Sequence, residues 1–242
     1  MKKNNMKNLS KIDLASYHTL SYNQNSKSLI NTINAHSFNT LQKDFDFYES
    51  LQKSTILLPD GISIVFAIRL LTGKKIGKIA GEDLFKWEME RMEQDRGKAF
   101  FLGSSEATLT KIVERAKREY PNVTVATYSP PYKPEFTAED NLQMVEAVNS
   151  FKPDVLFIGM TAPKQEKWAA AHFEQLEATH VCSIGAVFDF YAGTVKRAPH
   201  WMIAIGMEWF YRLVREPKRM WKRYLFGNAL FIYYIINEKL RS

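Results

Sequence analysis

The 242-residue sequence contains a single cysteine, Cys182, and therefore no intramolecular disulfide. This excludes the small secreted domains that depend on disulfides and favours a reducing compartment. Cys182 lies within the apolar run from Val181 to Ile184, where a thiol is more often a small core residue than a nucleophile. We therefore expect no catalytic role for it.

Long hydrophobic runs are also absent. Residues 1–10 are rich in Asn and Lys and lack the apolar stretch of a secretory signal. The longest late apolar run, residues 225–236, is interrupted by Gly227 and Asn228 and is too short to cross about 30 Å of hydrocarbon as a helix. This run can lie on a bilayer but cannot cross one.

The sequence has neither a Gly-x-Gly-x-x-Gly fingerprint nor a phosphate-binding loop ending in Gly-Lys-Ser/Thr. These are the usual glycine-rich loops of dinucleotide and ATP sites, so their absence argues against both kinds of site. We accordingly predict no cofactor.

Apolar β-forming runs alternate with helical patterns along most of the chain. This alternation is typical of a parallel sheet covered by helices on both faces, and it predicts a Rossmann-like α/β domain. A composition that is 45% hydrophobic supplies enough apolar surface for such a core. The expected strands are residues 28–33, 54–58, 98–103, 123–128, 155–158 and 181–184.

Positive charge is concentrated at the C-terminal end. Residues 196–242 contain ten Lys or Arg against three Glu, a net charge of +7 that equals the charge of the whole chain. Aromatic residues interleave with these cations. The pattern predicts a helical appendage with an anionic partner, and it fits both an interfacial membrane helix pair and a single-stranded nucleic-acid surface. We divide the chain into an N-terminal extension (1–27), a catalytic domain (28–195) and a membrane-associating appendage (196–242).

Polar residues follow several expected strands, at the sheet edge where α/β proteins bind ligands. Asp60 stands in a Pro-Asp-Gly turn before a helix, a placement suited to proton transfer, although the same tripeptide is a common turn without function. Gly103-Ser104-Ser105 precedes another helix and offers backbone N–H groups to an anion such as a diphosphate.

Asp44 and Asp46 form an Asp-x-Asp pair of the kind that holds a divalent metal in many sugar-nucleotide enzymes. The apolar residues around the pair favour a helix start instead, where carboxylates stabilise the helix dipole. We therefore predict no metal site.

Six motifs occur in order, and together they resemble the WecG/TagA/CpsF family of bacterial glycosyltransferases across about residues 28–224. They are Pro59-Asp60-Gly61, Gly81-x-Asp83-Leu84, Pro-Lys-Gln-Glu at 163–166, Phe-Asp-Phe-x-Ala-Gly at 188–193, Lys-Arg-Ala-Pro at 196–199, and Gly-Met-Glu-Trp-Phe-Tyr-Arg-Leu at 206–213 followed by Glu-Pro at 216–217.

The resemblance implies an inverting enzyme that moves a sugar from a UDP-sugar to a polyprenyl-diphosphate-linked saccharide, without an obligatory metal. It places the enzyme in the cytoplasm, peripherally on the inner face of the membrane, in cell-surface polysaccharide or teichoic acid synthesis. The implied donor sugars are of the N-acetylmannosamine type, its uronic acid, or glucose. The oligomeric state stays open, with a homo-oligomer among the alternatives.

The resemblance also assigns roles residue by residue. Asp60 matches the proposed general base, and Thr32 and Asn34 match a Thr-x-Asn near the donor sugar. Gln165 matches the pocket-facing glutamine, and Arg212 and Arg219 match arginines that reach the diphosphate. Lys78 replaces an arginine common in the family, which leaves a point charge where the family has a bidentate group.

Two other functions compete with this reading. A nucleic-acid-binding protein would use the basic, aromatic appendage, and its affinity would fall steeply with salt. A non-catalytic nucleotide-binding protein would bind the donor without transferring sugar. The transferase reading predicts no nucleic-acid partner.

Overall fold

The computed structural model describes residues 6–15 and 26–241, apart from the side chains of His200, Ala204 and Arg219. Six strands form one parallel sheet in the order β2-β1-β6-β5-β3-β4. The predicted Rossmann-like α/β fold is thereby confirmed. The strands are β1 (Ser28–Ile33), β2 (Ile56–Pro59), β3 (Lys98–Gly103), β4 (Thr124–Tyr128), β5 (Val155–Gly159) and β6 (His180–Ser183).

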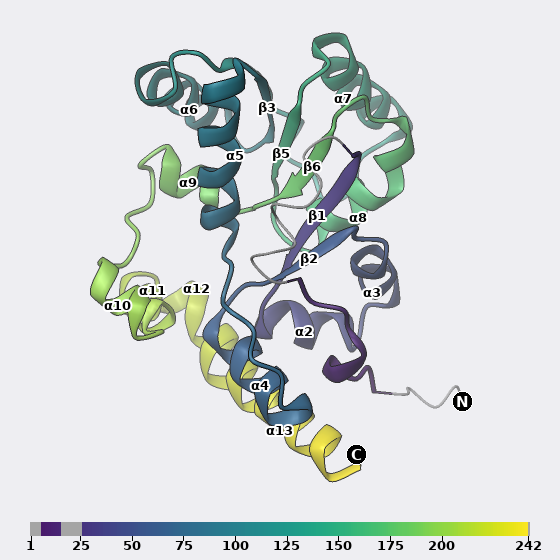
Figure 1. The fold of residues 1–242 in the computed structure, drawn as a ribbon, viewed down its shortest axis with the longest axis vertical. Helices are drawn as coiled ribbons and strands as arrows, with labels where there is room; N and C mark the ends of the chain where they lie inside the picture. The colour runs from purple at the N-terminus through teal and green to yellow at the C-terminus, as the bar shows by residue number, and fades with distance from the viewer. Residues whose placement is uncertain (1–5, 16–25, 242) are drawn as a thin grey trace.

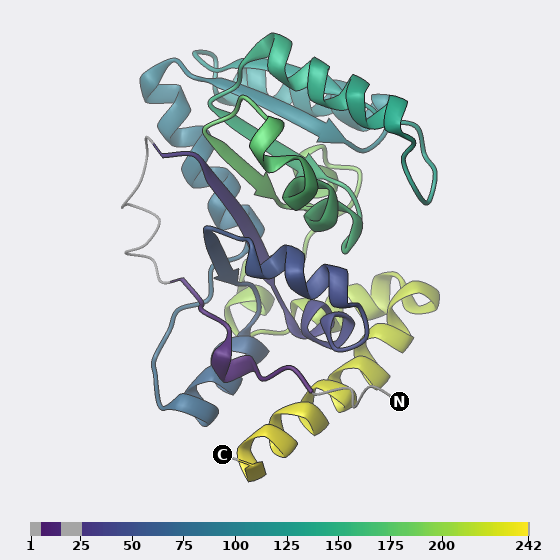
Figure 2. The same ribbon diagram turned by 90° about the vertical axis from the view of Figure 1, so that its right-hand side faces the viewer.

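Helices surround the sheet on both faces (Figures 1 and 2). Up to the end of β6 they are α2 (Ala35–Leu41), α3 (Phe45–Gln52), α4 (Ile62–Thr72), α5 (Gly81–Asp95), α6 (Glu106–Glu119), α7 (Ala138–Phe151) and α8 (Lys164–His172), with short 3-10 turns η1 (Leu9–Lys11) and η2 (Phe173–Gln175). After β6 the described chain is helical, with α9 (Val187–Tyr191), α10 (His200–Ala204), α11 (Glu208–Arg215), α12 (Pro217–Trp221), the π-helical turn η3 (Lys222–Phe226) and α13 (Gly227–Arg241).

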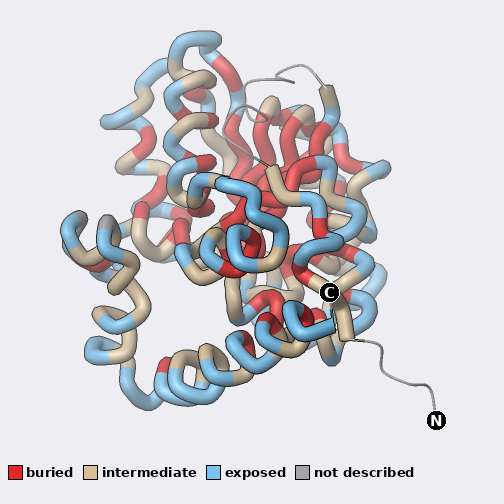
Figure 3. Tube along the Cα trace, turned by 60° about the horizontal axis from the view of Figure 1, so that its bottom comes forward, coloured by how far each residue is buried: buried red, intermediate tan, exposed pale blue. Residues whose placement is uncertain are grey.

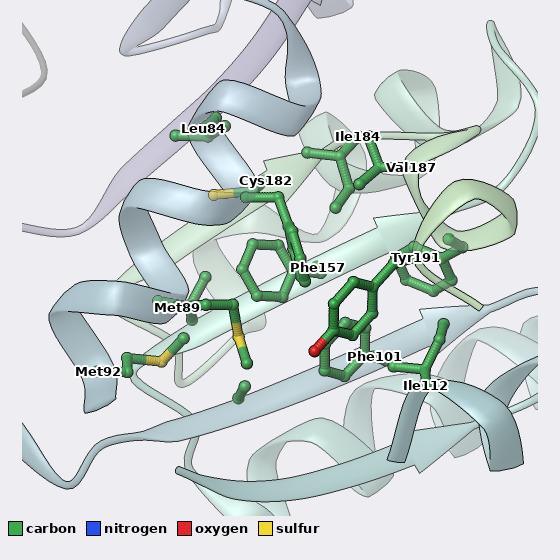
Figure 4. Close-up of a cluster of buried hydrophobic side chains, with 14 of the residues drawn as sticks. Leu84, Met89, Met92, Phe101, Ile112, Phe157, Cys182, Ile184, Val187 and Tyr191 are labelled. Atoms are coloured by element: carbon green, nitrogen blue, oxygen red, sulfur yellow. The ribbon is translucent and has the colours of Figure 1, made fainter. Parts of the chain in front are cut away.

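The core follows the period-two geometry of the strands, because successive side chains point to opposite faces of a sheet. Phe101 and Phe157 pack under α5, α6 and α9, whereas their neighbours Phe100 and Leu156 pack under α7 and α8. Figure 4 shows Phe101 and Phe157 beside Tyr191, and the rings of Phe101 and Phe157 are 5.2 Å apart. Buried residues are concentrated in the sheet and on the inner sides of the helices (Figure 3).

Cys182 lies in β6 and is fully buried. Burial raises the pKa of its thiol well above the usual value, so the reactive thiolate is disfavoured. The core position expected for Cys182 is confirmed.

Helix α13 packs back onto the body of the protein beside α2 and α4 (Figures 1 and 2). Phe231 and Ile235 are buried with residues of α2, and the Phe231 ring meets Phe38 edge to face at 5.6 Å. The buried carboxylate of Glu238 accepts the backbone N–H groups of Leu9 and Ser10 at 2.7 and 2.8 Å. The two ends of the described chain are therefore joined through α13.

Candidate active site

A cleft of about 1550 Å³ opens at the carboxyl ends of the strands. The chain changes direction across the sheet at β1. Strand β2 lies on one side of β1, and β6 and the remaining strands lie on the other side. In open α/β sheets this position is the usual ligand site. Of the predicted site residues, the structure brings together Thr32, Asn34, Asp60, Lys78, Gln165 and Arg212 as lining of this cleft.

Asp60 follows β2 directly and is half-buried on the cleft wall. Its backbone N–H donates to the carbonyl of Ile33 at 2.9 Å, which extends the β1–β2 pairing by one residue. Gly61 then adopts a φ of 118°, a conformation that glycine reaches without the Cβ penalty, and α4 begins at the next residue. This sharp turn holds the Asp60 carboxylate at the edge of the sheet.

Opposing groups act on the pKa of Asp60. Desolvation and the negative charge of Glu208 raise this pKa to about 6, while Lys78, a hydrogen bond from Asn34 and the charge of Arg197 act in the opposite direction. A carboxyl with a pKa near 6 is mostly ionised at neutral pH and is a stronger base than an ordinary aspartate. Asp60 is therefore suited to accept a proton.

Asn34 and Lys78 reach Asp60 from neighbouring segments. The Oδ1 atom of Asn34 accepts the backbone N–H of Ser37 at 3.0 Å and caps α2, so its amide nitrogen is left to donate to Asp60. The backbone N–H of Ile79 donates to the carbonyl of Pro59 at 3.0 Å, which holds Lys78 beside the carboxylate.

Gln165 and Glu166 form a buried pair at the start of α8. The Nε2 atom of Gln165 donates to Oε1 of Glu166 at 2.9 Å, while Oε1 of Gln165 and Oε2 of Glu166 have no hydrogen-bond partner among the described residues. Burial raises the pKa of Glu166 to about 7. Gly185 allows this packing, since a Cβ there would lie 3.3 Å from Oε1 of Gln165.

Arg212 of α11 enters the cleft from the C-terminal region. Its guanidinium lies 5.8 Å from the ring of Phe190, and its buried Nε has no hydrogen-bond partner among the described residues. A buried guanidinium donor facing a cleft is suited to a diphosphate oxygen. Arg219 lies in α12, but its side chain falls outside what the structure describes.

Asp44 caps a helix, as the sequence predicts. Its side chain accepts the backbone N–H of Phe47 at 3.0 Å at the start of α3, and its carboxylate pairs with Lys167 at 2.7 Å. Burial acts to raise the pKa of Asp44, but the contact with Lys167 and the hydrogen bond from Phe47 outweigh it, so the pKa is lowered. Asp46 occupies the first turn of α3, where a carboxylate favours the helix dipole.

Arg197, Glu208 and Glu82 were not among the predicted site residues. Arg197 forms ion pairs with Glu82 and Glu208, and the distance to Glu208 is 3.3 Å. This group joins the start of α5 to α11 across the cleft and includes the carboxylate that raises the pKa of Asp60. Arg197 and Glu208 each lie within one of the family motifs, which could have marked them as site residues. The spacing of these residues in the sequence did not indicate that they approach Asp60.

The α/β fold carries a cleft in which a carboxylate of raised pKa lies among cationic side chains. Residues 4–242 match the model of the glycosyl transferase WecG/TagA/CpsF family. Three curated relatives are named N-acetylglucosaminyldiphosphoundecaprenol N-acetyl-beta-D-mannosaminyltransferase. The Bacillus subtilis (strain 168) protein is 33% identical over 82% of this chain and 75% of its own length. The Bacillus spizizenii protein is 31% identical over 74% and 67%, and the Staphylococcus aureus (strain MW2) protein is 27% identical over 90% and 83%.

This chain belongs to the WecG/TagA/CpsF family and is a glycosyltransferase. The family predicted from the six motifs is confirmed, and so is the prediction of an enzyme. Among the residues that the structure describes, no helix combines the length and apolar character needed to span a bilayer.

Proposed function

We propose that this enzyme transfers N-acetylmannosamine, with inversion, from its UDP derivative to an N-acetylglucosamine carried on polyprenyl diphosphate. The resemblance left three kinds of donor sugar open, and the names of the relatives favour the N-acetylmannosamine type. The observation that carries the proposal is the position of Asp60, a carboxylate with a raised pKa in the same cleft as Lys78, Arg197 and Arg212.

Asp60 serves as the general base in this proposal. As the acceptor hydroxyl attacks the anomeric carbon, its proton passes to the Asp60 carboxylate and a new bond forms between that carbon and the acceptor oxygen. The bond from the anomeric carbon to the diphosphate breaks, and its electron pair leaves with UDP. Attack opposite to the leaving group inverts the configuration. General-base assistance of this kind contributes about 10²- to 10⁴-fold to the rate.

Departure of UDP leaves negative charge on the diphosphate, and fixed positive charge at that position lowers the barrier. Arg212 and Lys78 line the cleft and are assigned this role, together with Arg219. Helix α6 has 14 residues and follows Ser104 and its N-cap Ser105, which both line the cleft, and its N-terminus offers backbone N–H groups to the same anion. These groups supply the positive potential without a metal, and independence from metal ions stays a prediction.

Thr32, Asn34 and Gln165 are assigned to the donor sugar. Thr32 and Asn34 lie at the carboxyl end of β1, next to Asp60. The side-chain carbonyl oxygen of Gln165, on the cleft wall, has no hydrogen-bond partner within the described part of the chain, which suits a sugar hydroxyl or an acetamido N–H group.

The enzyme is proposed to work as a peripheral protein on the cytoplasmic face of the membrane. Its acceptor is lipid-linked, and the net charge of +7 in residues 196–242 favours an anionic surface. Trp201, Trp221 and Phe226 of this region are exposed, and aromatic rings are suited to the headgroup level of a bilayer. No nucleic-acid partner is proposed.

Transfer assays with a panel of UDP-sugars and a lipid-diphosphate-linked N-acetylglucosamine acceptor test the proposal. UDP-N-acetylmannosamine should be the preferred donor, and Asp60→Asn should reduce turnover about 10²- to 10⁴-fold while UDP binding persists. Asp46→Asn is the matched control, because Asp46 is exposed on α3 and does not line the cleft. Equal turnover by Asp60→Asn and the wild type would contradict the assignment of Asp60 as the general base. Preference for another sugar would contradict the assignment of N-acetylmannosamine as the donor sugar.

A further inference from the structure

Helices α4 and α13 each carry a row of exposed apolar side chains in addition to their buried faces. On α4 the row is Ile62, Phe66 and Leu70, which are 40%, 62% and 55% exposed. On α13 it is Ile232 and Ile236, which are 56% and 50% exposed. Both rows have the four-residue spacing of a single helix face. Contiguous exposed apolar side chains rimmed by polar residues are typical of binding surfaces.

The two rows line the same cleft as Asp60. The helices that carry the two rows, α4 and α13, pack against each other (Figures 1 and 2). The α4 row begins two residues after Asp60 and extends about 12 Å along the helix, at 1.5 Å per residue. We call this surface, formed by Ile62, Phe66, Leu70, Ile232 and Ile236, the apolar groove.

The lining of the cleft combines three kinds of side chain. Asp60 and Asn34 are polar, Arg212 and Arg223 are cationic, and the apolar groove belongs to the same cleft. A lipid-linked acceptor has the same three parts, since its sugar is joined to a diphosphate and the diphosphate to a hydrocarbon chain. A protein segment or a second copy of this chain would not require cationic side chains and an apolar groove in one cleft with a carboxylate.

We propose that the apolar groove binds the first isoprenoid units of the acceptor lipid and thereby draws them out of the membrane. This inference rests on the proposed function and adds a lipid-tail subsite to it. Burial of hydrocarbon against the exposed side chains of the groove contributes binding free energy in proportion to the area removed from water. The groove also fixes the direction of the acceptor, because the tail lies along α4 and α13 while the sugar points toward Asp60.

Two acceptors with the same N-acetylglucosamine diphosphate test this subsite. One carries a long polyprenyl chain and the other a short alkyl group, and both are assayed in detergent micelles so that docking on a bilayer is not required. Phe66→Gln and Ile232→Gln should each lower the ratio of kcat/KM for the long acceptor to kcat/KM for the short acceptor by about tenfold. Both side chains are exposed, so the variants should fold normally.

Leu142→Gln on α7 and Leu240→Gln on α13 are matched controls, since both leucines are exposed and neither lines the cleft. Their ratios should equal that of the wild type. An unchanged ratio in Phe66→Gln and Ile232→Gln would overturn the subsite. An equal fall in Leu240→Gln would also overturn it, because the effect would then reflect general contact of apolar side chains with the micelle.

Crosslinking supplies a readout that does not depend on turnover. A polyprenyl diphosphate with a photoreactive group near its diphosphate should label peptides that contain Phe66 and Ile232, and Phe66→Gln should reduce the labelling. Labelling of a wild-type protein that turns over neither acceptor would contradict the proposed function but support the groove. Absence of labelling on both helices would overturn the groove even if transfer is observed.

Discussion

Burial raises the pKa of Asp60 most strongly, the Glu208 carboxylate raises it further, and nearby cations lower it. Glu208 is the main charged group that raises this pKa. It also pairs with Arg197, whose positive charge lowers the pKa. The proposed general base, Asp60, works only when ionised, so kcat/KM should fall about tenfold per pH unit below about 6 and level off above that pH.

Replacing Glu208 by Gln should move this acidic limb to lower pH. The substitution removes a negative charge near Asp60 and leaves Arg197 with one paired carboxylate, Glu82, instead of two, and both changes lower the pKa of Asp60. The measurement is kcat/KM between pH 4.5 and 8.5. Glu49→Gln is the control, since Glu49 is exposed on α3 and should leave the limb in place. If the acidic limb of kcat/KM lay at the same pH in Glu208→Gln as in the wild type, a group other than Asp60 would control the pH dependence.

A second prediction concerns Glu166 and the pH dependence of the protein's stability. Its pKa is raised from the ordinary 4.5 to about 7, so the folded protein holds a proton that the unfolded chain has already released. Stability should therefore fall as pH rises from about 4.5 to about 7 and change little above that. Glu166→Gln cannot ionise and keeps an acceptor for Gln165.

The free energy of unfolding of Glu166→Gln should gain about 3 kcal/mol relative to the wild type between pH 4.5 and 7. Urea denaturation at both pH values measures this difference. Glu174→Gln, at an exposed carboxylate, should show no such gain. A constant difference between wild type and Glu166→Gln would mean that Glu166 ionises normally in the folded state.

At the scale of elements, α13 has two different faces. Phe231 and Ile235 are buried with residues of α2, while Ile232 and Ile236 are exposed, and all four border the cleft. Phe231 is 5% exposed and contacts Phe38, and Glu238 is bonded to the backbone of Leu9 and Ser10. The helix is therefore part of the folded body and also part of the cleft wall.

Phe231→Ala should destabilise the protein by about 3–5 kcal/mol, because it leaves a cavity beside Phe38. Tyr233→Ala on the same helix is the control, since Tyr233 is 59% exposed and its loss should cost less than about 1 kcal/mol. Chemical denaturation measures both values. Similar losses in the two variants would indicate that α13 contributes through its helical structure and not through its buried face.

At the scale of the whole molecule, positive charge and exposed aromatic rings occur together in residues 196–242. Lys218 and Lys222 are exposed near Trp221 and Phe226, which are 41% and 66% exposed. Each basic residue near an anionic leaflet contributes about 1 kcal/mol to attachment, and salt weakens this attraction. The separation of a membrane-associating appendage from the catalytic domain stays a prediction.

Lys218→Gln and Lys222→Gln should each weaken binding to anionic liposomes about fivefold, and the loss should shrink as salt is added. Lys117→Gln on α6 removes the same charge from an exposed site elsewhere and should bind as the wild type does. Sedimentation with vesicles of known anionic content measures the binding. Equal losses in all three variants would indicate that net charge, and not the location of the lysines, controls attachment.

The sequence by itself determined the features that depend on local pattern. The six apolar runs predicted the six strands, and the residues around Asp44 predicted the start of α3, because strand alternation and helix capping involve neighbours along the chain. The position of Asp60 at the end of a strand followed from the same pattern. Its assignment as a base came from the resemblance to the family and stays a prediction.

Only the tertiary structure decided which distant residues meet. Arg197 and Glu208 approach Asp60 because α5 and α11 come together across the cleft, and no local pattern specifies that approach. The apolar run of α13 is equally compatible with a bilayer surface and with a protein core. Its sequence could therefore not show that Phe231 is buried while Ile232 is exposed. That division depends on which face α2 and α4 cover, because burial of an apolar side chain is set by the elements packed against it.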